Sequence, residues 1–113
     1  MLKRILLGLT CVVAASAIVA AADPKLVAKG QALTVKNKCA MCHTLEGKGG
    51  KIGKPLDGVS GRIDEATMRK ILADPQKELP PQTPPPAAKM PKVAWEKGDI
   101  DAVVAYLQTL KAR

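Results

Sequence analysis

The stretch Cys39-Ala40-Met41-Cys42-His43 carries the most information in this chain of 113 residues. It places two thiols on either side of a two-residue spacer and an imidazole directly after the second thiol. The chain has no other His, and its third Cys, Cys11, lies near the N-terminus. Any chemistry of this stretch therefore uses these three side chains and groups that are distant in the sequence.

Three ordinary interpretations of the Cys pair are weak here. A structural zinc site needs four protein ligands, usually Cys and His, and Cys39, Cys42 and His43 supply only three. A thioredoxin-like redox pair would lie near a βαβ pattern, which the sequence lacks. A plain disulfide, the usual state of a Cys pair in an exported protein, would leave unexplained how the chain fills its core.

Covalent attachment of one haem explains both the spacing and the composition. Two thiols separated by two residues can each add to one vinyl group on the same edge of a haem, and the adjacent His then lies under the ring, where it can bind iron. The chain has no Phe, one Trp and one Tyr. Because so small a domain rarely builds a sufficient core alone, we predict a haem c held by Cys39 and Cys42, with His43 as an iron ligand.

The N-terminus reads as a targeting segment. A basic start at Lys3 and Arg4 precedes a run of 18 uncharged residues, Ile5 to Ala22, which ends in small residues. This pattern predicts a signal peptide over residues 1–22, a mature domain over 23–113 and a periplasmic location. The alternative is an uncleaved membrane anchor, since 18 residues are at the edge of what spans a bilayer.

The remaining pattern predicts an all-α fold of about three to four helices with long ordered loops. A helix should begin at Asp23-Pro24, with Asp as its cap and Pro in its first turn, and should end near Lys38. A second helix should cover Glu65 to about Ala73, with Asp74-Pro75 ending it. The last helix should follow Gly98-Asp99, with its apolar residues at helical spacing. Residues 39–62 are rich in Gly and predict a loop, and no strand pattern is visible.

The proline cluster over residues 80–86 cannot form a helix or a central strand. It is either a solvated linker or a stiff strap that holds the segment Lys89-Met90-Pro91. Because a final helix follows soon after, the strap is the favoured interpretation.

A second axial ligand must come from outside the Cys39–His43 stretch, and methionine is the remaining candidate. Met41 lies within the attachment loop on the His side and cannot reach across the ring. Met68 is at core spacing on a predicted helix. Met90 lies between prolines in a segment without regular structure, so we predict Met90 as the sixth iron ligand.

Taken in order, Gly30 in the first helix, the Cys-x-x-Cys-His motif, the Gly-rich loop, Lys89-Met90-Pro91 and Tyr106-Leu107 resemble the class I cytochromes c of small bacterial type. The resemblance implies a cytochrome c-like fold wrapped around one covalently bound haem, with Gly30 and Tyr106 at a crossing of the first and last helices.

The same resemblance implies roles for residues around the haem. The stretch Gly53-Lys54-Pro55-Leu56 is similar to a family segment in which a Pro carbonyl accepts the proton of the ligand His, which would be Pro55. Lys54 is then an insertion. Arg62 would pair with a haem propionate or be a solvated loop cation, and Trp95 would pack at the propionate edge or simply in the core.

These residues predict a one-electron carrier rather than an enzyme. Two protein ligands at iron leave no open position, and no acid–base pair, nucleophile or phosphate loop occurs elsewhere in the sequence. A dedicated haem subunit of a larger oxidoreductase would share every motif, and an open-site peroxidase or gas sensor would need Met90 to be unligated.

The charge of the chain predicts its partners. Residues 23–113 have 16 bases and 10 acids, a net charge of +6, and eight lysines flank the haem motif or the Met segment. We expect this basic haem edge to steer docking onto acidic redox proteins, the alternative being ordinary solvation. Nucleic-acid binding is not expected because stacking aromatics are nearly absent, and membrane contact is expected only through an uncleaved N-terminal segment.

Overall fold

A computed structural model describes Gly8 and residues 23–113. The predicted signal peptide over residues 1–22 therefore lies outside the described residues, apart from Gly8, and the boundary at Asp23 remains a prediction. Of the helices in the described part of the chain, none is both long and apolar enough to cross a membrane.

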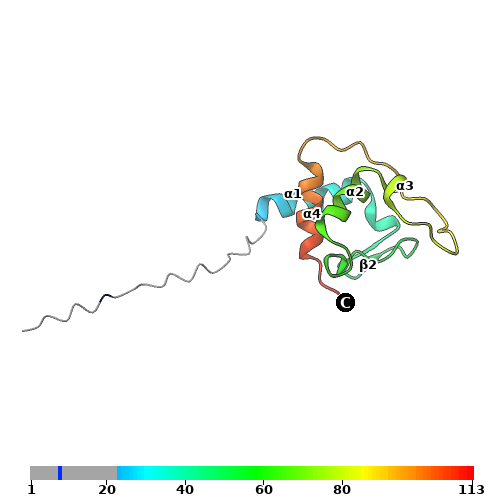
Figure 1. The fold of residues 1–113 in the computed structure, drawn as a ribbon, viewed down its shortest axis with the longest axis horizontal. Helices are drawn as coiled ribbons and strands as arrows, with labels where there is room; N and C mark the ends of the chain where they lie inside the picture. The colour runs from blue at the N-terminus through cyan, green and yellow to red at the C-terminus, as the bar shows by residue number, and fades with distance from the viewer. Residues whose placement is uncertain (1–7, 9–22) are drawn as a thin grey trace, which may run out of the picture.

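The fold of residues 23–113 is mostly helical, as predicted (Figure 1). Its elements in chain order are α1 (Pro24–Lys36), the 3-10 turn η1 (Cys39–Met41), β1 (Thr44–Leu45), β2 (Lys48–Gly49), the 3-10 turn η2 (Val59–Gly61), α2 (Glu65–Ala73), α3 (Pro75–Glu78) and α4 (Asp99–Thr109).

Helix α1 begins as the sequence predicts and ends earlier. The Asp23 side chain accepts a hydrogen bond from the Lys25 amide at 2.9 Å, and Pro24 occupies the first turn. At the other end, the Asn37 side chain donates to the Leu33 carbonyl at 2.9 Å, and Lys38 adopts a left-handed conformation with φ of 55°. The predicted end near Lys38 was therefore two residues too late, because this local turn ends the helix at Lys36.

Asp74 lies between α2 and the short helix α3 and caps both of them. Asp64 caps α2 by accepting from the Thr67 amide at 2.7 Å, and α2 covers Glu65–Ala73 as predicted. Asp74 ends α2 and then caps α3, where its side chain accepts from the Lys77 amide at 3.4 Å and Pro75 fills the first turn. Helix α3 was not predicted, because a helix of four residues is too short to show periodicity in the sequence.

Helices α1 and α4 cross in direct backbone contact (Figure 1). A Cβ on Gly30 would lie 2.0 Å from the Ala102 carbonyl oxygen and 2.8 Å from Tyr106 Cβ. Only glycine allows this approach, so the predicted roles of Gly30 and Tyr106 at the crossing are confirmed. Burial raises the pKa of Tyr106, and the nearby Glu46 and Asp57 charges raise it further.

A small hairpin lies in the region that was predicted as a loop without strands. Thr44 pairs with Gly49 and Leu45 with Lys48 in an antiparallel register. The two residues between the strands, Glu46 and Gly47, have φ of 51° and 77°, as a tight type I′ turn requires. The expectation of no strand was thus wrong here, because strands of two residues are too short to show alternation.

The buried core is centred on α4. Its fully or nearly buried residues come from β1, η2, α2 and the α4 region; they are Leu45, Val59, Met68, Leu72, Val103, Val104, Tyr106, Leu107 and Leu110. A second set packs against this core while remaining half-buried, and it includes Cys39, Leu56, Ile63, Met90 and Trp95.

The segment between α3 and α4 runs as a long loop at the edge of the molecule (Figure 1). Residues 80–89 are exposed and without regular structure. Met90 is the first half-buried residue after them, and the Trp95 indole donates to the Leu72 carbonyl on α2 at 2.7 Å. The segment is thus fastened to the body after the prolines, which favours the strap interpretation.

Candidate haem attachment site

The backbone around Cys39 coils so that the two thiols and the imidazole come from one tight turn. The amides of Cys42 and His43 both donate to the Cys39 carbonyl, at 3.2 and 3.0 Å. Cys39 and Cys42 are half-buried free thiols rather than a disulfide. Burial raises the pKa of the Cys39 thiol above its usual value, which favours the protonated form.

His43 is oriented by a backbone carbonyl. Its Nδ1 lies 2.7 Å from the Lys54 carbonyl oxygen, so Nδ1 donates and Nε2 is left as the free lone pair for a metal. Gly53 makes this possible, since a Cβ there would lie 2.5 Å from His43 Cε1.

The acceptor for His43 was predicted to be Pro55, and this was wrong. The Gly53 amide donates to the Cys42 carbonyl at 2.7 Å and the Leu56 amide to the Thr44 carbonyl at 2.9 Å. These two bonds fix the register so that the residue directly after Gly53 faces the imidazole. Lys54 therefore occupies the acceptor position itself and is not an insertion.

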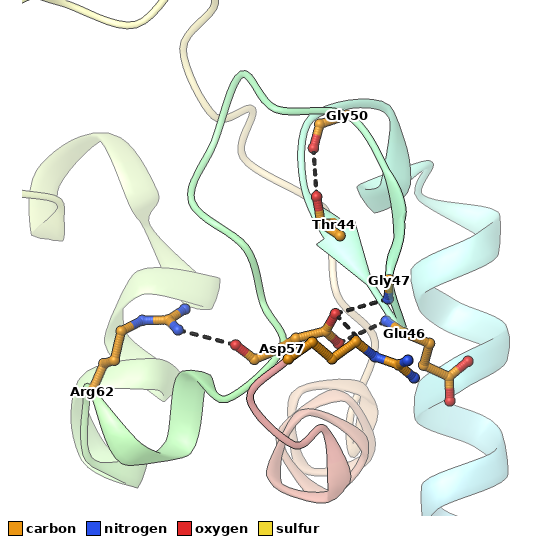
Figure 2. A network of polar contacts seen from close by, with 7 residues as sticks. Thr44, Glu46, Gly47, Gly50, Asp57 and Arg62 are labelled. Atoms are coloured by element: carbon orange, nitrogen blue, oxygen red, sulfur yellow. Dashed lines mark hydrogen bonds and ion pairs between the residues drawn. The ribbon is translucent and has the colours of Figure 1, made fainter.

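Pro55 and Arg62 contact each other. The Arg62 guanidinium donates to the Pro55 carbonyl and to the Asp57 carbonyl, the second bond being 3.0 Å long. Its side chain is thereby fixed over the loop that follows His43 (Figure 2). A role for either residue in the haem surroundings stays a prediction.

The three methionines of the described chain lie in different environments. Met41 is 67% exposed on the attachment turn, and Met68 is 3% exposed within the core. Met90 is half-buried and packs against the core from an irregular segment. Met90 alone among them lies at the surface of the core without belonging to a helix or turn.

These side chains fit a haem c. Two free thiols are available for thioether bonds, an imidazole has Nε2 free, and a thioether sulfur lies on the segment after the prolines. Leu56, Ile63 and Trp95 are half-buried against the same core and offer apolar surface to a porphyrin. In residues 23–113, no three His, Cys, Asp or Glu side chains gather as a conventional metal site.

Two hydrogen-bonding groups near His43 were not predicted from the sequence, namely the Lys54 carbonyl and the Asp57 carboxylate. The role of the Lys54 carbonyl cannot be recognised in the sequence, because every residue has a main-chain carbonyl that can accept a hydrogen bond. Asp57 is 6% exposed, and its carboxylate accepts from the Glu46 and Gly47 amides at 2.7 and 2.8 Å (Figure 2). An acid between Leu56 and Gly58 in a lysine-rich loop was the one available signal.

Comparison with known proteins agrees with this site. Neither the curated proteins nor the solved structures contained a match to the chain. The family model for Cytochrome c matches residues 27–111, which is most of the chain and includes most of α1, the Cys-His turn and α4. The chain therefore belongs to the cytochrome c family, whose members bind haem c covalently and carry electrons.

Proposed function

We propose that this cytochrome carries single electrons through one haem bonded to Cys39 and Cys42, with His43 and Met90 as the two iron ligands. The hydrogen bond between His43 Nδ1 and the Lys54 carbonyl, at 2.7 Å, carries this proposal. It fixes the tautomer in which Nε2 binds iron and makes the imidazole a better electron donor to the metal.

Each protein group then has a defined task. Cys39 and Cys42 keep the cofactor attached whatever the state of the axial ligands. Met90 supplies a neutral sulfur ligand, which raises the reduction potential relative to a second imidazole. The bound haem supplies reversible one-electron exchange at iron. With both axial positions filled by protein side chains, no position is left for a substrate.

We propose further that partners dock on a basic surface around the Cys-His turn and the Met90 segment. We call it the lysine rim; all its members are exposed, namely Lys36, Lys38, Lys48, Lys51, Lys54, Lys89, Lys92 and Lys97. Glu46 is the only acid in the sequence between Lys36 and Lys54. Such a surface favours acidic partners and speeds their encounter.

The proposed place of action is the periplasm, after removal of residues 1–22. The basic start, the apolar run and the small residues before Asp23 support export. The match to the family begins at residue 27, just after this segment.

Absorption spectra of the oxidised and reduced holoprotein test the proposed ligation. We expect low-spin spectra in both states, a weak sulfur-to-iron band in the ferric state, and no binding of carbon monoxide to the ferrous protein. A high-spin spectrum or tight binding of carbon monoxide would contradict it and favour an open-site haem protein.

A further inference from the structure

Two segments around His43 run side by side and are joined in register by successive hydrogen bonds. The Gly53 amide meets the Cys42 carbonyl, and the Leu56 amide meets the Thr44 carbonyl. Between them lies the bond from His43 Nδ1 to the Lys54 carbonyl. Successive contacts thus join residues in the same order along the two segments. We call this series of hydrogen bonds, together with the bonds of Asp57 described in the next paragraph, the His43 ladder.

The ladder ends on a side chain instead of on the backbone. The Asp57 carboxylate accepts the Glu46 amide on Oδ1 at 2.7 Å and the Gly47 amide on Oδ2 at 2.8 Å. Both amides belong to the tight turn of the β1–β2 hairpin. Figure 2 shows the carboxylate pointing into this turn.

The carboxylate is well suited to this position. Asp57 is 6% exposed, and its nearest cation, Arg113 Nε, lies 3.6 Å from Oδ2 on a side chain that is 62% exposed. Each of the two N–H donors has its own carboxylate oxygen here. An Asn side chain has one oxygen and would turn its own N–H₂ group toward the second donor.

We propose that Asp57 is a positioning residue for the iron ligand His43. By holding the hairpin turn against the loop 53–58, it closes the ladder and keeps the Lys54 carbonyl in place for His43 Nδ1. Asp57 itself forms no hydrogen bond with the imidazole; its carboxylate bonds only the two turn amides and faces Arg113. This inference rests on the proposed ligation by His43 and adds to it a residue that controls the ligand from the far end of the ladder.

Hydrogen exchange in the ferrous holoprotein, followed by NMR, tests the proposal. In Asp57→Asn we expect the His43 Nδ1 proton and the Glu46 and Gly47 amide protons to exchange about tenfold faster or more, since hydrogen bonds to a charged acceptor are lost. The reduction potential should rise, because the imidazole donates less electron density to iron.

Two variants separate positioning from charge. Glu46→Gln removes a negative charge at the same turn through an exposed side chain, and Arg113→Gln removes the ion pair; both keep the Asp57 bonds. We expect His43 Nδ1 exchange to stay within about twofold of wild type in both. If Asp57→Asn speeds only the two turn amides and leaves His43 Nδ1 exchange unchanged, Asp57 merely stabilises the hairpin and the proposal is refuted.

The wild-type protein gives an independent test if Asp57→Asn does not fold. Under native conditions with increasing denaturant, the His43 Nδ1 proton and the Glu46 and Gly47 amides should open with the same free energy and the same denaturant dependence. Unrelated opening would overturn the proposal. The absorption spectrum of the wild-type protein is recorded first. If it shows no His ligation, the proposed function is refuted, and this outcome is distinct from failure of the Asp57 proposal.

Discussion

The orientation of the His43 imidazole depends on two loop residues, Gly53 and Lys54, and neither acts through a side chain. Gly53 leaves room for the imidazole, and Lys54 supplies the acceptor. The ammonium group of Lys54 is free to serve the lysine rim because its side chain is not needed at the imidazole. One short loop thus orients the imidazole of the proposed iron ligand and contributes a charge to the proposed docking surface.

Gly53→Ala should displace the imidazole. The new Cβ would lie 2.5 Å from Cε1 and 2.7 Å from Nδ1 of His43, so the ring or the loop must move. We expect a loss of about 1–3 kcal/mol in unfolding free energy and a weaker low-spin ferric spectrum, measured by denaturant unfolding and absorption. Gly61→Ala is the control, because nothing lies within 4 Å of its Cβ; equal effects in both variants would refute the steric explanation.

Met90→Ala should convert the iron to an open site. The haem should remain attached through Cys39 and Cys42, the ferric iron should become high-spin or water-bound, and the potential should fall. Carbon monoxide should then bind the ferrous protein, as a flash-photolysis or titration experiment would show.

Met68→Leu is the matched control for this variant. Met68 is 3% exposed within the core, and the swap keeps an apolar side chain of similar volume, at a cost below about 1.5 kcal/mol. Loss of the ligation in Met68→Leu, with retention in Met90→Ala, would show that the wrong methionine has been assigned.

Groups whose role depends on residue type and spacing could be predicted from the sequence, and contacts made with main-chain groups could not. The Cys pair with its adjacent His is defined by residue type and spacing, and so was predicted directly. The acceptor of His43 was misassigned to Pro55, because the loop register is set by main-chain bonds at Gly53 and Leu56. Asp57 was overlooked for a related reason, since its partners are amides that any residue would provide.

At the scale of elements, the crossing of α1 and α4 holds the two ends of the domain together. The Gly58 amide also donates to the Leu110 carbonyl at 2.9 Å, and a Cβ on Gly58 would meet Ala112 Cβ at 2.7 Å. The end of α4 is therefore fastened both to α1 and to the loop after His43.

Gly30→Ala should destabilise the protein although alanine favours helix. Helix propensity alone would gain about 1 kcal/mol. The Cβ would, however, lie 2.0 Å from the Ala102 carbonyl oxygen, so the helices must separate, and we expect a net loss of about 1–3 kcal/mol. Thermal or denaturant unfolding measures this, and a stabilised Gly30→Ala protein would contradict the close crossing.

Capping residues and apolar spacing predicted the longer helices. The hairpin and α3 were not predicted because they are too short. Asp64 and the Asp74-Pro75 pair set both ends of α2, so its bounds were predicted correctly. The end of α1 was misplaced, because Asn37 competes for the last carbonyls in a way that residue spacing does not show. Each strand of the hairpin has two residues and α3 has four, so each spans only about one period of its pattern, which is too short to show a repeat.

At the scale of the whole molecule, charge is unevenly distributed along the chain. The lysine rim lies around the Cys-His turn and the Met90 segment, whereas seven of the ten acids lie within residues 64–101, in or near α2, α3 and the start of α4. Some of these acids are engaged within the domain: Arg69 pairs with Glu65 and Asp101, and Lys29 with Asp99 at 3.3 Å. Within residues 23–113, none of the rim lysines forms an ion pair.

Electron transfer to an acidic partner should be sensitive to salt. Between low salt and ~0.15 M, where screening acts over roughly 8 Å, we expect the second-order rate constant to fall about tenfold or more. Lys51→Glu should lower the low-salt rate, whereas Lys25→Glu, an equal charge change outside the lysine rim, should change it much less. A rate independent of salt would remove the steering role and leave the lysines as solubility groups.

Export should remove the N-terminal segment. The intact mass of the protein purified from its natural compartment should equal residues 23–113 plus one haem. A mass that includes residues 1–22 would show instead that the apolar run is retained as an anchor.

The indole of Trp95, bonded to the Leu72 carbonyl, gives the protein an optical reporter of its own. It is the only Trp in the chain, and it lies five residues after Met90 on the segment that fastens to α2. A haem absorbs at the wavelengths at which tryptophan emits, so the folded holoprotein should be nearly dark in fluorescence. The fluorescence of Trp95 should increase as this segment detaches from α2. Stopped-flow fluorescence would therefore measure directly the rate at which the segment that carries Met90 is released.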